Sequence, residues 1–218
     1  MGFAVYLKKE FNSLELSAEQ QSEVWSNSLI VHMIQIALLG LCFKFAHESS
    51  TFNIKPATGL DMMAARFIAS MFMHINTERD VRGGISMMKY AVNHHEHFTN
   101  VTPAFIIALL LTLCSFLVEI NVMLILSSIG DVLNVIMKYV SLCAIAHLPR
   151  FYFSSLVANK ASKFGSLTLK IHNYRYQNKL KDADWHIKLL RFVYKGWRLF
   201  FCSVSYYFMP FMMIFLNF

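Results

Sequence analysis

The chain has 218 residues and a formal net charge of +7 at pH 7; 56% of its residues are hydrophobic and only 15% are charged. A water-soluble domain carries about 25% charged residues, whereas the mean hydropathy here is +0.44. These values exclude an ordinary soluble domain. They predict an all-α, multi-pass integral membrane bundle that forms a single transmembrane domain over residues 1–218.

The N-terminal third is expected to contain one amphipathic and two apolar segments. Residues 7–27 combine apolar positions with a glutamate-rich polar face, which predicts an amphipathic helix on the membrane surface. Residues 29–46 are apolar and long enough to cross a bilayer. Residues 60–75 carry Asp61 and Arg66. This segment either spans the membrane, giving five transmembrane helices, or lies along the surface, giving four.

A polar region precedes a pair of apolar helices. Residues 76–100 are mixed in charge, and Gly83 and Gly84 are expected to break this region before a short helix. Two spans are then predicted at 101–126 and 131–149. The serines and the glycine between them form the turn, and Asp131 caps the second helix.

Each of these two spans carries one charge near its middle. Glu119 and Lys138 lie about equally far from the centre of the turn, roughly 14 Å along each helix at a rise of about 1.5 Å per residue. An unpaired charge at this depth costs at least ~2.5–3.5 kcal/mol, so such residues usually face the protein interior and pair. We therefore predict a Glu119–Lys138 pair.

Polar residues at helical spacing extend this pair into a predicted polar seam. Ser115 and Thr112 precede Glu119 on one face of the first helix, and Asp131 and Asn134 precede Lys138 on the second. Small and hydroxyl side chains allow close helix contact in lipid. The seam is interpreted either as a structural contact between helices or as part of an ion or proton path.

The C-terminal third is a basic region followed by a last apolar segment at 199–218. Residues 150–198 contain 11 of the 20 basic residues and two acids, with interleaved aromatic residues. This composition predicts a region at the membrane interface, on the cytoplasmic or matrix side by the positive-inside rule, with residues 76–100 on the same side and the turn near 128 on the other. Trp185 to Arg198 is predicted to be an amphipathic helix on the inner surface. The expected contacts to lipid headgroups or partners are Lys179, Lys181, Lys188, Arg191, Lys195 and Arg198.

The histidines and cysteines give little support for a metal site. His94, His95 and His97 form the densest group of possible ligands, but membrane di-iron enzymes need several such clusters. The cysteines sit within apolar segments and are interpreted as packing residues; they are Cys42, Cys114, Cys143 and Cys202. We expect no metal and no cofactor apart from bound lipids.

Two functions remain from the sequence. The first is a non-enzymatic subunit of a larger or homo-oligomeric membrane assembly, whose partners are lipids, other membrane subunits or copies of itself. The second is an ion channel or transporter subunit that uses Glu119 and Lys138 in the permeation path. Nucleic-acid binding is not expected, because apolar segments flank the basic stretch.

Overall fold

The computed structural model describes residues 2–8, 17–48, 57, 59–155 and 184–216, and this part of the chain is helical with no β-strand. Two short 3₁₀ helices, η1 (Ala4–Tyr6) and η3 (His95–His97), accompany the longer elements. These are α1 (Ala18–Glu48), α2 (Leu60–Asn93), α3 (Val101–Ser128), α4 (Val132–Ala146), α5 (Leu148–Ser155), α6 (Trp185–Phe200), the π-helical turn η5 (Phe201–Ser205) and α7 (Tyr206–Leu216).

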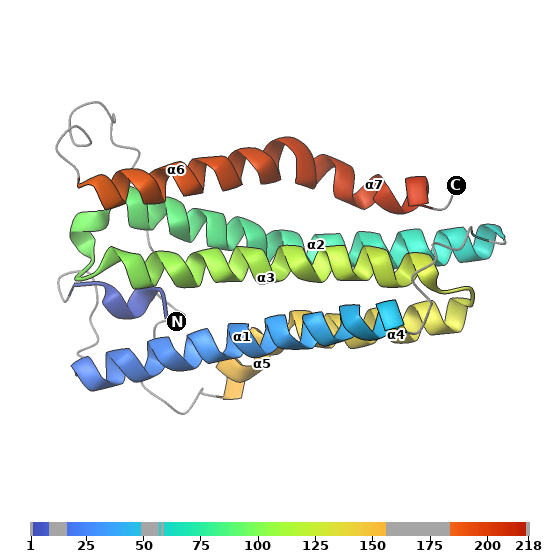
Figure 1. The fold of residues 1–218 in the computed structure, drawn as a ribbon, viewed down its shortest axis with the longest axis horizontal. Helices are drawn as coiled ribbons and strands as arrows, with labels where there is room; N and C mark the ends of the chain where they lie inside the picture. Colours follow the sequence, from blue (N-terminus) through green and yellow to red (C-terminus); the bar gives the residue numbers. More distant parts are fainter. Residues whose placement is uncertain (1, 9–16, 49–56, 58, 156–183, 217–218) are drawn as a thin grey trace.

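The long helices run along one common axis (Figure 1). The central pair is α2 and α3, with α1 and α4 on one side and α6 and α7 on the other. Successive long helices alternate in direction, so the α2–α3 connection lies at one end of the bundle and the α3–α4 turn at the opposite end. The all-α class is therefore confirmed for the described residues.

Side-chain caps fix where several helices begin. Ser17 and Gln20 bond reciprocally to each other's backbone N–H, at 3.2 Å in both directions, which is a capping box at the start of α1. The Asn100 side chain accepts from the Thr102 N–H before α3. As predicted, Asp131 caps α4, since its carboxylate accepts from the Asn134 N–H at 3.1 Å.

The predicted amphipathic helix over 7–27 is wrong in its bounds. α1 begins at Ala18 and continues without interruption through the apolar segment to Glu48. Before it, Phe3, Val5 and Leu7 are buried. Leu7 forms an isolated β-bridge with Phe98, so the start of the chain is fastened to the α2–α3 connection. Residues 9–16 lie outside the described part of the chain.

The predicted break at Gly83 and Gly84 is also wrong. α2 is a single helix from Leu60 to Asn93. Two glycines cost roughly 1 kcal/mol each in a helix interior, but Gly84 is buried where α2 lies closest to α3. Packing against α3 along most of its length stabilises α2 through the polar stretch.

The last three elements form one rod beside α2. The amphipathic helix predicted from Trp185 is present as α6, and η5 joins it directly to α7. The rod runs along the bundle, and α6 packs against α2 (Figure 1). Residues 156–183 lie outside the described part of the chain, together with Lys179 and Lys181.

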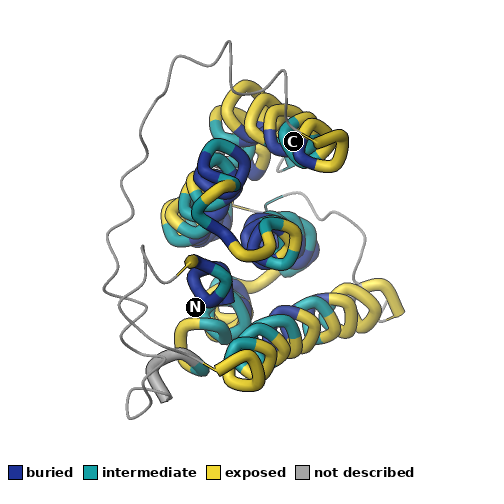
Figure 2. Tube along the Cα trace, turned by 90° about the vertical axis from the view of Figure 1, so that its left-hand side faces the viewer, coloured by how far each residue is buried: buried dark blue, intermediate teal, exposed yellow. Residues whose placement is uncertain are grey.

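Several polar side chains are buried within a mostly apolar core, and many large apolar side chains are exposed on the outside of the bundle. Arg66, Glu119 and Thr112 are at most 1% exposed, whereas Phe45, Leu133 and Phe211 are 68%, 64% and 48% exposed. Exposed positions follow the outward faces of the helices (Figure 2). Two helical segments, Ala18–Phe45 and Val101–Ser128, are long and apolar enough to cross a membrane, and α4 is a shorter apolar helix.

Candidate functional site: a buried histidine–glutamate pair

The charged group at the centre of α3 has a partner on α2. The Glu119 side chain contacts the imidazole of His74. Both residues are buried, with Glu119 1% and His74 5% exposed. The His74 Nδ1 and Glu119 Oε1 atoms are joined by a hydrogen bond. Each residue lies near the middle of a long helix. The structure therefore places an acid and a titratable base together in the interior.

The predicted Glu119–Lys138 pair is not the one that forms. Lys138 is exposed on α4, as are Asn134 and Asp131. The polar stripe of α4 faces away from α3, because the apolar face with Val135 and Leu142 is the one packed into the core. His74 was not among the predicted site residues.

The predicted seam residues on α3 are buried but bond within their own helix. The Thr112 hydroxyl donates to the Leu109 carbonyl at 2.8 Å, and the Ser115 hydroxyl donates to the Leu111 carbonyl at 2.9 Å. Such local bonds satisfy a hydroxyl without a partner helix. The half of the seam on α3 is therefore interior, while the half on α4 is on the surface.

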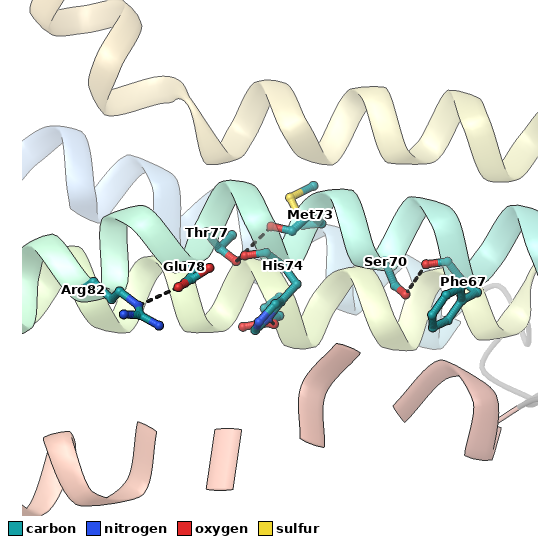
Figure 3. A network of polar contacts seen from close by, with 8 residues as sticks. Phe67, Ser70, Met73, His74, Thr77, Glu78 and Arg82 are labelled. Atoms are coloured by element: carbon teal, nitrogen blue, oxygen red, sulfur yellow. Dashed lines mark hydrogen bonds and ion pairs between the residues drawn. The ribbon is translucent and has the colours of Figure 1, made fainter. Parts of the chain in front are cut away.

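A column of polar residues recurs at every fourth position of α2. Its members are Arg66, Ser70, His74, Glu78 and Arg82, and Figure 3 shows the last four. A four-residue spacing winds slowly around a helix of 3.6 residues per turn. The column accordingly begins fully buried at Arg66 and ends at Arg82, whose side chain is 57% exposed.

Contacts along this column tie its two ends to different parts of the bundle. Arg66 Nη2 donates to the carbonyl oxygen of Ile129 at 2.7 Å, next to the α3–α4 turn. At the other end, the Arg82 Nε atom lies 2.5 Å from the Glu78 carboxylate. The sequence signal for this column is the four-residue period, which continues through the stretch that was expected to be broken.

The π-helical turn brings a third element to the pair. The ring of Tyr206 lies 5.8 Å from the His74 ring, and the Arg82 guanidinium carbon lies 4.7 Å from the Tyr206 ring centroid, a cation–π contact. Beside Tyr206, Ser205 is 3% exposed, and its hydroxyl has no hydrogen-bond partner among the described residues. Short π-helical segments often occur at functional sites.

The histidines before α3 form an aromatic cluster. The His94 and His97 rings stack with centroids 4.9 Å apart, and the Tyr90 hydroxyl lies 3.0 Å from His97 Nδ1. Within the described residues, no group of three or more histidine, cysteine or acidic side chains is arranged to hold a metal ion. The geometry here supports packing of the α2–α3 connection around the buried N-terminal residues.

Four of the predicted headgroup contacts lie on α6. Lys188, Lys195 and Arg198 are exposed, and Arg191 is half-buried. Ile187 and Tyr194 are buried, and Arg191 shares their face by helical spacing, whereas Trp185, Leu189 and Phe192 on the far side are exposed. The basic face of α6 therefore borders its buried face, and large apolar side chains occupy the side turned away from the bundle.

Comparison of the chain with protein-family models, curated proteins and solved structures finds no match to any of them.

Proposed function

We propose that the chain is a multi-pass membrane protein that acts as a non-enzymatic subunit of a larger membrane assembly. Five helical rods of alternating direction would cross the bilayer: α1, α2, α3, α4 with α5, and the rod of α6 and α7. The many exposed apolar side chains and the buried polar ones support this placement, because a bilayer solvates apolar side chains and polar ones pair inside.

The charges support one orientation for this bundle. Arg82, Lys89, Arg150 and the basic face of α6 lie toward the end that carries the α2–α3 connection. Glu48, Asp61 and Asp131 lie toward the other end, where Lys44 pairs with Glu48. Short basic segments stay on the side from which insertion starts. The basic end is therefore placed on the cytoplasmic or matrix side, where the α6 lysines and arginines can attract anionic lipids.

The polar stripe on the outer face of α4 is the observation that supports the assembly role. Asn134, Lys138 and Ser141 follow a helical spacing and are all exposed, between the exposed apolar residues Leu133 and Val140. A lysine on a face that would otherwise meet lipid is unfavourable by at least ~2.5–3.5 kcal/mol at the bilayer centre. A partner that covers the stripe removes this cost.

The partner that fits this stripe is a transmembrane helix carrying a carboxylate at the depth of Lys138. A second copy of the chain fits poorly. A twofold axis along the membrane normal would set Lys138 against Lys138. In the described helices the acid near that depth is Glu119, which is buried and already paired with His74. The proposed contact is therefore between different proteins.

Replacing Lys138 tests this proposal. In material isolated in mild detergent from the cells that naturally make the protein, Lys138→Met is expected to reduce the native mass from that of a complex to that of a single chain. Lys138→Arg should retain the complex. Lys44→Met is the matched control, since Lys44 is an exposed lysine near the end of α1 that pairs with Glu48.

Two results of native mass spectrometry would reject the proposal. One is a Lys138→Met complex of unchanged mass, which would mean that the lysine merely extends to the membrane surface. The other is a complex made only of copies of this chain.

An ion path lined jointly by Glu119 and Lys138 is not proposed, because Glu119 is enclosed in the bundle while Lys138 is exposed on its outer surface.

A further inference from the structure

We propose that His74 and Glu119 form a proton-transfer site at the centre of the bundle, and that the protein moves protons across the bilayer through it. This inference rests on the membrane placement proposed above but not on a partner at α4. It adds an activity to the assembly role, and it follows from the contact between His74 and Glu119 and from the column on α2.

Stability alone does not account for an ionisable pair in this position. A buried ion pair is often no more stabilising than well-packed apolar residues of similar volume. The neighbouring core of α2 and α3 is built from such residues, including Met73, Val118 and Val122. Acidic and histidine side chains inside membrane helices are typical of proton relays, and histidine changes its charge near neutral pH.

The column on α2 supplies a route from the pair to the basic end of the bundle. Glu78 lies one turn beyond His74, and its side chain is 24% exposed. It contacts Arg82, which is more exposed and whose guanidinium covers the Tyr206 ring beside His74. We therefore assign to Glu78 the exchange of protons between the inner solution and His74.

Toward the opposite end, the column on α2 is fully buried. Ser70 is 1% exposed and donates to the Phe67 carbonyl, and Arg66 is 0% exposed and bonded to Ile129. A fixed arginine in a narrow path repels protons and other cations. The site is thus set to exchange with the basic end first, and release on the other side requires Arg66 to move.

Among the described residues, few charged and titratable groups lie around the pair. On α2 they are Glu78 and Arg82, and on the C-terminal rod the phenol of Tyr206. From the side of α4, the Asn76 amide contacts the Cys143 thiol at 3.9 Å. The pair itself supplies one carboxylate and one imidazole. Calcium or magnesium needs about six or more oxygen ligands, so this donor set fits a proton.

The transfer step balances without any other reactant. With a neutral imidazole donating its Nδ1–H to the carboxylate, the pair has a net charge of −1. An incoming proton forms a new N–H bond at His74 Nε2 and gives an imidazolium–carboxylate pair of net charge 0. Loss of either ring proton to water on the other side restores the starting charge.

Proton flux in reconstituted vesicles tests the proposal. The full-length protein would be placed in liposomes that contain a pH-sensitive dye, and a potassium gradient with valinomycin would drive proton entry. We expect wild-type flux well above that of empty liposomes. Glu119→Gln and His74→Gln keep a hydrogen-bonding side chain but remove the titration, and each should lower the flux at least tenfold.

Two exposed-residue variants serve as controls, and vesicle flotation is the second measurement. Glu48→Gln and His186→Gln change exposed residues at the ends of α1 and α6, and they should retain wild-type flux. Flotation of the vesicles checks insertion. Failure to insert would reject the membrane placement and this proposal together. Insertion with no flux, or equal flux in the wild type and both site variants, would reject the proton path alone. If one site variant does not fold, the other decides.

Discussion

His74→Leu is expected to destabilise the bundle strongly. It leaves the Glu119 carboxylate buried without its partner, and breaking a buried pair on one side costs about 3–5 kcal/mol. Glu119→Leu leaves a neutral imidazole unsatisfied, which costs less, about 1–3 kcal/mol. The free energy of unfolding would be measured in mixed detergent micelles.

The double variant His74→Leu/Glu119→Leu tests whether the losses in the two single variants arise from the contact between His74 and Glu119. It removes both polar groups and should recover much of the loss, because two apolar residues replace the pair. Lys138→Leu is the control: it is exposed on α4 and should leave the unfolding free energy nearly unchanged. If the double variant loses the sum of the two single losses in unfolding free energy, or if Lys138→Leu causes a large loss, then Glu119 does not pair with His74.

The second large effect is expected at the closest contact between α2 and α3. A Cβ atom added at Gly84 would lie 2.5 Å from Thr112 Cγ2 and 2.8 Å from the Ala108 carbonyl oxygen. The threonine methyl can rotate away, but the backbone oxygen cannot, so the two helices must separate. Gly84→Ala should therefore lower the unfolding free energy by about 1–3 kcal/mol, and Gly84→Val by more.

The neighbouring glycine provides a control of opposite sign. A Cβ atom at Gly83 would meet nothing within 4 Å, so Gly83→Ala should stabilise the helix by roughly 0.5–1 kcal/mol. Adding Thr112→Ser to Gly84→Ala removes the methyl contact and should restore part of the loss. Equal effects at the two glycines would mean that α2 and α3 are not in close contact there.

The parts of the fold that depend on local chemistry were predictable. The apolar spans at 29–46 and 101–126 lie within α1 and α3, the Asp131 cap is present, and the helix beginning at Trp185 is α6. Each of these depends on composition or on a short motif. A sequence carries such signals without reference to the rest of the fold.

The features that were missed depend on tertiary contacts. Gly83 and Gly84 favour a break when judged alone, but close packing against α3 keeps α2 continuous. Because α2 is continuous, His74 lies beside Glu119. The equal distances of Glu119 and Lys138 from the α3–α4 turn predicted the depth of Lys138 but not the direction in which its side chain points. The four-residue period from Arg66 to Arg82 was present in the sequence, and a helical interpretation of the whole stretch would have found it.

The central claim is that this bundle crosses a membrane with its basic end on one side. Single cysteines would replace Thr99, Gly130 and Asp184, all exposed at the ends of the bundle, after removal of the four natural cysteines. An impermeant thiol reagent would then be applied to sealed, oriented vesicles. We expect the Thr99→Cys and Asp184→Cys variants to react from one side and the Gly130→Cys variant only from the other. Reaction of the Gly130→Cys and Thr99→Cys variants from the same side would contradict the membrane-spanning arrangement.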